Sequence, residues 1–227
     1  MNSCAQLAAR WIFDRGAWNV STTNKAFNYI FNTMNNSPLA VHWRAAKRVL
    51  CYLKITQDHV ITDSKSTNHG AVLKAYWNVN WGGNKHTRRS TSGVLIFLSD
   101  GPVVYRSKRQ SSVALSLAEY MALALATQEV LWLRYLLEKI GLQSSGATKI
   151  MMDYKSAISM ATNLGYMPRA KHIDLWTYFV RDHVESGNIS LTYVPSQDQL
   201  ADFLTKAIPT PRFTQLRELS NIVPYSS

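Results

Sequence analysis

The sequence predicts an α/β protein with a mixed sheet, and the order of its segments carries this prediction. From residue 65 onward, segments typical of strands and helices follow one another as three strands, helix, strand, helix, strand and helix. A run of strands followed by alternating helices and strands favours a mixed sheet with helices on its faces. With 227 residues, of which 46% are hydrophobic, the chain is long enough to bury a core.

The N-terminal part reads as helical. Residues 1–24 show no clear period, and residues 24–34 favour a helix. Pro38 then opens a second helical pattern, in which apolar residues recur at three- and four-residue steps as far as Leu53. Residues 63–70 are polar and turn-like, so we place the main domain boundary there. The expected organisation is a helical segment 1–64, an α/β domain 65–208 and a C-terminal tail 209–227.

Three antiparallel strands are expected at the start of the α/β domain. They cover residues 71–81, 91–98 and 102–107. The last two are joined by Asp100-Gly101, and an Asp-Gly pair between strand-like runs is a strong hairpin signal. We therefore expect a hairpin with its turn at these two residues.

Helices and strands alternate in the rest of the domain. A long helix is expected over residues 117–140 and ends at Gly141, a residue type favoured just after a helix. It is followed by a buried strand over 149–153, helices over 154–163 and 173–186, and a strand over 189–194. Ser196 to Gln199 has the form of a capping box, so we expect a last helix that begins there and ends at Pro209.

The charge distribution points to a polyanionic partner. The net charge is +11, and residues 65–115 alone contain eight basic side chains and one acidic side chain. Such an excess favours nucleic acid as the partner, although a merely basic surface is the plainer reading. There is no long apolar run and no signal peptide pattern, and Cys4 and Cys51 form no disulfide framework. We expect an intracellular protein with no membrane partner and no small-molecule cofactor.

Three carboxylates stand where a hard cation could bind. Asp153 ends a short apolar strand, Glu119 lies in the first turn of the long helix, and Asp202 lies in the last helix. If they converge, they suit Mg²⁺, and two such ions activate water for phosphodiester hydrolysis. Each acid also has a structural reading, because Glu119 completes a capping box, Asp153 is a good N-cap and Asp202 is compatible with a solvated helix face.

A resemblance to a known family adds what spacing alone does not give. The relevant strings are WRAAKRVLCYLK at 43–54, RRSTSG at 88–93, VALS at 113–116, AEY at 118–120, KHID at 171–174 and QLADFLTK at 199–206. In this order they resemble the C-terminal part of copia-type retrotransposon Pol polyproteins, which comprises the tail of the reverse transcriptase and then a ribonuclease H domain. The resemblance implies a ribonuclease H-like fold after residue 65 and a remnant of the reverse transcriptase before it.

The family's active site implies roles for four positions. It is a four-carboxylate centre with two Mg²⁺ ions that cuts the RNA strand of an RNA–DNA hybrid, and Glu119, Asp153 and Asp202 match three of its acids. The first, metal-bridging aspartate falls on Asn78, since the family's Tyr-x-Asp-Ala-Asp-Trp is replaced by YWNVNW at 76–81. An amide offers one neutral oxygen where a carboxylate offers two charged ones. We therefore expect an impaired ribonuclease H, or alternatively a non-catalytic nucleic-acid-binding remnant.

Basic residues around the first strands are the candidate nucleic-acid contacts. Phosphate contacts from such groups give affinity without reading sequence. The candidates are Lys85, Arg88, Arg89, Ser90, Lys108 and Arg109, with Lys171 and His172 as a second group. A solvated basic loop remains the alternative for the first group, and a structural role for His172. Trp77 and Trp81 are able to stack on bases, but their strand spacing favours packing in the sheet.

Overall fold

The computed structural model describes residues 40–62, 72–83, 87–110, 118–142, 146–162 and 171–225. The helix predicted over residues 24–34 lies outside these ranges. The chain divides into two units, one formed by residues 1–61 with 207–227 and the other by residues 62–206. The second unit contains the sheet that the sequence predicts.

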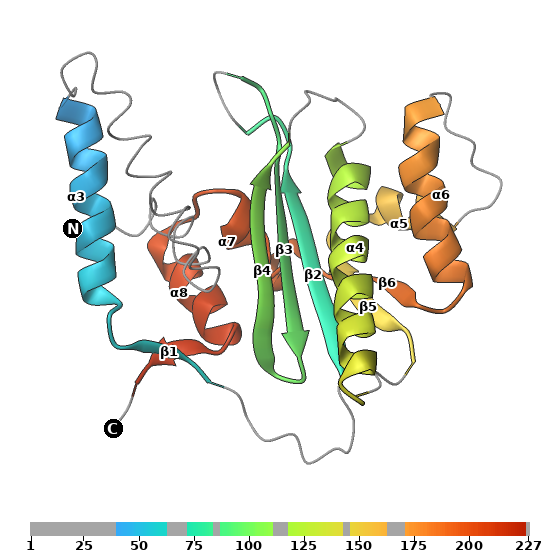
Figure 1. Cartoon of the computed structure of the whole chain (residues 1–227). Helices are drawn as coiled ribbons and strands as arrows, with labels where there is room; N and C mark the ends of the chain where they lie inside the picture. Colours follow the sequence, from blue (N-terminus) through green and yellow to red (C-terminus); the bar gives the residue numbers. More distant parts are fainter. Residues whose placement is uncertain are drawn as a thin grey trace. The chain divides into compact units, whose positions relative to one another are not determined.

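The larger unit is built on a five-stranded mixed sheet (Figure 1). Its strands are β2 (Leu73–Asn80), β3 (Thr91–Leu98), β4 (Gly101–Arg109), β5 (Thr148–Met152) and β6 (Ile189–Tyr193). In space they follow the order β4-β3-β2-β5-β6. The first three are antiparallel to one another, whereas β5 runs parallel to both β2 and β6. The predicted α/β class with a mixed sheet is confirmed.

The β3–β4 hairpin forms, but its turn lies one residue earlier than predicted. Leu98 pairs with Gly101, so the two loop residues are Ser99 and Asp100 rather than Asp100 and Gly101. Ser99 takes the positive φ of 55° that such a tight turn requires. The pairing shifts between Ile96 and Phe97, and this irregularity absorbs an additional residue of β4. The register is therefore set by the bulge together with the turn.

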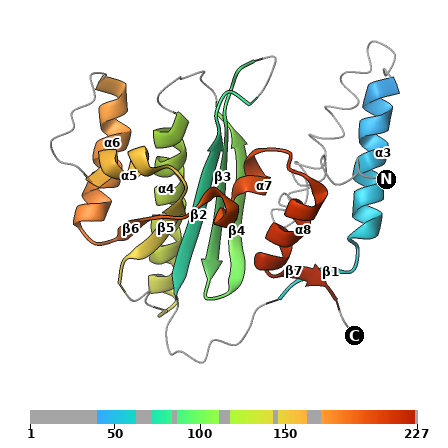
Figure 2. The same ribbon diagram turned by 180° about the vertical axis from the view of Figure 1, so that it is seen from behind.

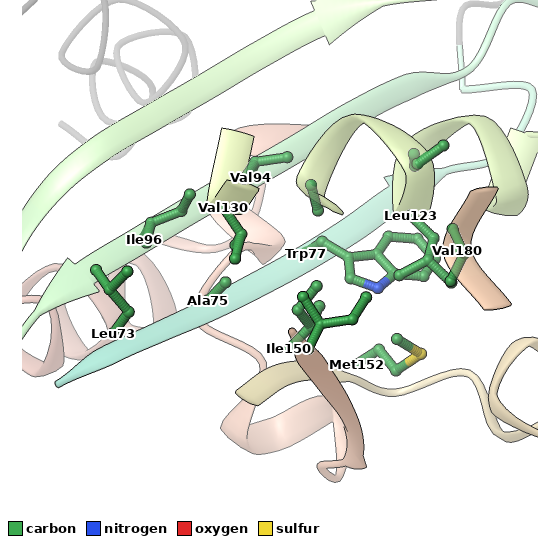
Figure 3. Close-up of a cluster of buried hydrophobic side chains, with 14 of the residues drawn as sticks. Leu73, Ala75, Trp77, Val94, Ile96, Leu123, Val130, Ile150, Met152 and Val180 are labelled. Atoms are coloured by element: carbon green, nitrogen blue, oxygen red, sulfur yellow. The ribbon is translucent and has the colours of Figure 1, made fainter. Parts of the chain in front are cut away.

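One face of the sheet is covered by helices. The long helix α4 (Ala118–Lys139) packs on β2 and β3, and α6 (Lys171–Glu185) packs on α4. The short helix α5 (Lys155–Thr162) contacts α6 and β6. Figure 3 shows the core between them, where Trp77 of β2 lies among Leu123 of α4, Met152 of β5 and Val180 of α6. Gly141 follows α4 with a φ of 79°, as expected for a residue that ends a helix.

The opposite face carries a short C-terminal segment, and here the predicted last helix is wrong. Ser196–Asp198 forms only a 3₁₀ turn without a side-chain cap, and α7 (Asp202–Thr205) is a single turn (Figure 2). Pro209 does not end a helix, because it is the N-cap residue of α8 (Thr210–Leu219). Asp202 is thus the first residue of a short helix rather than an interior residue of a long one.

The smaller unit contains the remaining elements. They are α3 (Ala40–Ile55), β1 (His59–Ile61), α8 and β7 (Ile222–Pro224). β1 pairs antiparallel with β7, and the rings of Tyr52 and Phe213 meet edge to face at 6.3 Å. Residues 209–227, predicted as a tail, therefore include a helix and a strand. None of the described helices combines the length and apolar character that crossing a membrane requires.

Candidate functional site

The face of the sheet opposite α4 receives α7, and Gly93 makes this close approach possible. Gly93 of β3 pairs with Asn78 of β2. A Cβ atom at Gly93 would lie 2.7 Å from Cγ2 of Thr205 and 2.9 Å from Cβ of Leu204. These separations are too short for carbon atoms, so only glycine lets α7 lie directly on the sheet beside Asn78.

Two polar side chains fix the segment around α7 to the strands. Gln199 is fully buried, and its amide donates to the carbonyl of Trp77 at 3.0 Å and accepts from the Ala201 N–H at 3.2 Å. The hydroxyl of Ser107, on β4, donates to the carbonyl of Leu204 at 2.6 Å. The backbone on both sides of Asp202 is thereby tied to the sheet, which determines where its carboxylate lies.

Asn78 and Asp202 are brought into direct contact, although 124 positions separate them in the chain. The Asn78 amide donates a hydrogen bond to Oδ1 of Asp202, and the ammonium of Lys206 lies 2.8 Å from the same oxygen. The Oδ1 atom of Asn78 accepts from the N–H of Val79 at 2.6 Å. Asn78 and Asp202 are each only 7% exposed. The Asp202 carboxylate is therefore held by donors from the protein itself.

Asp153 is the residue directly after β5, and β5 is the strand next to β2 in the sheet. Because Tyr76 pairs with Met151 in parallel register, residues 78 and 153 both lie two positions farther along, at the same level of the sheet. Asp153 is half-buried, and its Oδ2 accepts from the hydroxyl of Ser196 at 2.8 Å. The strand order thus brings Asp153 to the same end of the sheet as Asn78.

Glu119 belongs to the other side of the sheet. It is half-buried in the first turn of α4, beside Ala118. The buried Gln110 side chain donates both to the Ala118 carbonyl at 2.8 Å and to the Ser92 hydroxyl at 2.9 Å. This pair of bonds ties the start of α4 to the same end of β3. The capping box predicted from Ser116 lies outside the described residues.

These positions share one end of the sheet, but they do not form a ready metal site. In the described part of the chain, no three His, Cys, Asp or Glu side chains are grouped so as to hold a metal ion. Mg²⁺ prefers oxygen ligands, whereas Asp202 faces an amide and an ammonium, both of which are donors. As arranged, these residues do not fit a pair of Mg²⁺ ions. The metal-ligand roles of Glu119, Asp153 and Asp202 stay predictions.

A tyrosine lies on the same face as Asn78, two residues before it. Burial, and secondarily the negative charge of Asp198, raise the pKa of the Tyr76 phenol above its usual value of 10.0. The Tyr76 ring also packs edge to face on Phe97 at 5.9 Å. The phenol therefore stays protonated, and it contributes no negative charge to this face at neutral pH.

Four basic residues gather at the end of the sheet where Asn78 lies, and we call them the basic edge: Arg88, Arg89, Lys108 and Arg109. Arg109 pairs with Thr91 and Lys108 with Ser92, whereas Arg88 and Arg89 lie three and two residues before the start of β3. Arg88, Lys108 and Arg109 are exposed, and Arg89 is half-buried. Exposed cations at one edge are available to phosphates.

Other residues predicted to bind nucleic acid are placed differently. Ser90 is buried, and its hydroxyl accepts from the N–H of Gly82 at 3.1 Å, so it holds the turn. Lys85 lies outside the described residues, as do the side chains of Lys171 and His172 at the start of α6. Trp77 is a core residue, which confirms packing for this side chain, whereas Trp81 lies after the end of β2 and is 50% exposed, so the sheet packing predicted for it is wrong.

The acids are recognisable in the sequence, but the residues that position them are not. Gly93, Gln199 and Lys206 all lie within the strings that carry the family resemblance, so a signal was present. Their roles depend on contacts between distant segments, however, and spacing along the chain does not reveal such contacts.

The strand order and the flanking helices define the class of the larger unit as a ribonuclease H-like domain. The chain is 35% identical over 196 residues to the retrovirus-related Pol polyprotein from transposon RE2 of Arabidopsis thaliana, which covers 84% of this chain and 13% of the relative. It is 32% identical to the corresponding polyprotein from transposon TNT 1-94 of Nicotiana tabacum, over 81% of this chain and 14% of the relative. The chain is therefore similar to one segment of the retrovirus-related Pol polyproteins of transposons.

This similarity confirms the resemblance that the motifs predicted. The chain spans about one seventh or less of the length of these relatives. Among solved structures, LC11-RNase H1 isolated from compost is 16% identical, with a TM-score of 0.46 over 60% of this chain and 93% of that chain. No protein-family model matches the chain.

Proposed function

We propose that this chain is the ribonuclease H-like domain of a copia-type retroelement and that its Mg²⁺-dependent cleavage of the RNA strand in RNA–DNA hybrids is impaired by Asn78. One observation carries the proposal: the Asn78 amide donates to Asp202 at the position where the family has its first catalytic aspartate. The similarity to these polyproteins supports the substrate class, and this contact supports the impairment.

The impairment has a physical basis at both ends of the amide. The amide nitrogen of Asn78 is a donor and is engaged with Asp202, and its oxygen accepts from Val79. A carboxylate at this place would offer two charged oxygens to a cation, but the amide offers none that is unengaged. A loss of about 4 kcal/mol in transition-state stabilisation corresponds to a rate about a thousandfold lower.

Restoring the acid tests the proposal. The purified chain and its Asn78→Asp variant are given a labelled RNA–DNA hybrid with Mg²⁺ or Mn²⁺, and cleavage of the RNA strand is measured. We expect the variant to cleave about 100- to 1,000-fold faster than the native chain, which corresponds to about 3–4 kcal/mol. Asp202→Asn in the repaired background should abolish the gain.

Asn80→Asp is the matched control. It adds the same charge two residues farther along the same strand, where the Asn80 amide contacts the carbonyl of Thr205 at 3.4 Å rather than Asp202. The control should leave cleavage at the native level. If Asn78→Asp gives no cleavage, or if Asn80→Asp gives as much, the assignment of residue 78 to the catalytic position is wrong.

A second function, nucleic-acid binding without catalysis, is favoured by the basic edge. Arg88, Lys108 and Arg109 are exposed at the same end of the sheet as Asn78, so a strand bound there would lie beside the candidate site. Arg106 is less available, because it pairs with Glu129 at 3.1 Å. Binding through phosphates predicts an affinity that falls steeply as salt rises.

Binding is measured with an RNA–DNA hybrid by fluorescence anisotropy across a salt series. Lys108→Ala with Arg109→Ala should weaken binding at least tenfold and reduce the slope of log affinity against log salt by about two. The matched control is the double variant Lys139→Ala with Lys149→Ala. Lys149 of β5 lies opposite Lys74 of β2 in the strand register, at the other end of the sheet from the basic edge. Equal losses in both double variants would contradict a binding surface at the basic edge.

A further inference from the structure

We infer that Asn78 and Lys206 together take the place of a divalent cation at Asp202, so that the native domain keeps this position closed with its own donors. This inference rests on the proposed function, because it takes residue 78 as the position of the family's metal-bridging acid. It goes further in assigning a task to Lys206 and in predicting how folding responds to metal ions. We call Asn78, Asp202 and Lys206 the polar clamp.

The polar clamp balances the charge of Asp202 without a metal. The carboxylate is buried, and a buried charge is tolerated only when it is paired and hydrogen-bonded. The Lys206 ammonium provides the opposite charge at 2.8 Å, and the Asn78 amide provides a further donor to the same oxygen. In an acidic site, a divalent cation would balance such a buried negative charge. Here the side chains of Lys206 and Asn78 take over this task.

The geometry of α7 keeps the clamp in place. Lys206, four residues after Asp202, is the C-cap residue that ends α7 in an extended conformation, and from there its ammonium reaches the Asp202 carboxylate. The Lys206 N–H donates to the Asp202 carbonyl at 3.2 Å, and the Thr205 hydroxyl donates to the same carbonyl at 2.9 Å. With Gly93 admitting α7 to the sheet, these bonds hold Asp202 against β2 whether or not a metal ion is present.

The same contacts oppose metal binding. A cation that approached Oδ1 of Asp202 would meet the amide hydrogens of Asn78 and the positive charge of Lys206, so both side chains would have to leave. An aspartate at position 78 reverses the situation. Two buried carboxylates would then face each other, and like charges at short distance disfavour ionisation of both. Only the repaired protein would gain stability from a divalent cation.

Thermal unfolding of the full chain tests the inference, with Mg²⁺ and Mn²⁺ as probes. The native chain should show the same melting temperature with and without either ion. Asn78→Asp should melt about 3–6 °C lower than the native chain without metal and should regain this difference when Mg²⁺ is added. Asn80→Asp serves as the matched control, and its melting temperature should not respond to Mg²⁺.

Direct binding of Mn²⁺, measured by electron paramagnetic resonance, gives a second readout that does not depend on cleavage. In the native chain, Asp202→Asn should cause no loss of Mn²⁺ binding, because Asp202 binds none. The Asn78→Asp variant should bind Mn²⁺ at Asp202. Adding Lys206→Met to Asn78→Asp should tighten Mn²⁺ binding about tenfold, because Lys206 no longer competes for Asp202.

The outcomes separate this inference from the proposed function. If the native chain binds Mn²⁺ or gains thermal stability from Mg²⁺, and Asp202→Asn removes the effect, the inference is overturned even if Asn78→Asp cleaves hybrid. If Asn78→Asp gains metal-dependent stability but does not cleave, the polar clamp stands and the catalytic assignment fails. If Lys206→Met leaves Mn²⁺ affinity of the repaired protein unchanged, Lys206 has no part in the closure.

Discussion

The two faces of strand β2 differ in what determines their structure. On one face, Ala75 and Trp77 are buried in the hydrophobic core under α4. On the other, Asn78 and Asn80 meet α7 through hydrogen bonds to Asp202 and to the Thr205 carbonyl. The faces alternate residue by residue, because successive side chains in a strand point to opposite sides.

This difference shows where the sequence is tolerant and where it is not. Apolar packing is non-directional, so the core tolerates hydrophobic substitutions that keep its total volume and pattern. The α7 face depends on a few directional contacts from residues far apart in the chain, and each contact has one geometry. An exchange between Asn and Asp at residue 78 is therefore expected to leave the core intact and to change the contacts of the α7 face.

The largest effect is expected on the core face. Trp77→Ala removes a side chain that is only 1% exposed and should lower the free energy of unfolding by about 3–5 kcal/mol. Chemical denaturation monitored by circular dichroism measures the change. Trp132→Ala on α4, where the ring is 55% exposed, is the matched control and should cost less than about 1 kcal/mol. A similar loss in both variants would mean that Trp77 is not central to the core.

The next effect concerns the anchor of the α7 segment. Gln199→Leu keeps the volume but leaves the Trp77 carbonyl and the Ala201 N–H without this partner, so it should cost about 2–3 kcal/mol. Protection of the Ala201 amide in hydrogen exchange should fall at the same time. Gln128→Leu, at an exposed glutamine on α4, should change neither quantity. Unchanged stability in Gln199→Leu would contradict an anchoring role.

A smaller effect is expected from crowding at β3. Gly93→Ala places a methyl group against Thr205 and Leu204 and should cost about 1–3 kcal/mol. Thr205→Ser removes the closest carbon atom, Cγ2, and keeps the hydroxyl that donates to the Asp202 carbonyl. The double variant should therefore recover part of the loss measured by denaturation. If Thr205→Ser adds to the loss instead, the crowding at Gly93 is not what destabilises the protein.

The sequence predicts elements well where local patterns control them. The strand over residues 91–98 and the long helix that ends before Gly141 follow directly from periodicity and a local stop signal. The hairpin turn differs by one residue, because the bulge between Ile96 and Phe97 changes the pairing. The last helix fails for a related reason: long-range contacts to β2 and β4 hold residues 199–204 in a shape that local propensity does not encode.

The site is predictable only through the resemblance. Nothing in the spacing of Asn78 and Asp202 indicates that they touch, and the matched family strings alone place them together. Glu119 and Asp153 reach the same end of the sheet through the strand order and the tie between Gln110 and Ala118. The spacing of Lys206 and Asp202 is compatible with an ion pair, but that this pair meets Asn78 depends on a contact between distant segments, which spacing along the chain does not reveal.

The smallest expected effect is a pH dependence of stability that comes from the α7 face of β2. Tyr76 lies on the α7 face, and burial with the nearby Asp198 charge raises the pKa of its phenol above 10.0. Because the folded state favours the neutral phenol, its contribution to stability is complete below about pH 10 and is lost as the pH rises through the raised pKa. Alkaline unfolding should therefore be less steep in Tyr76→Phe, which keeps the ring against Phe97. Tyr135→Phe, whose ring is 59% exposed on α4, should unfold with the native slope. An equal change in both variants would show that alkaline unfolding does not begin on the α7 face.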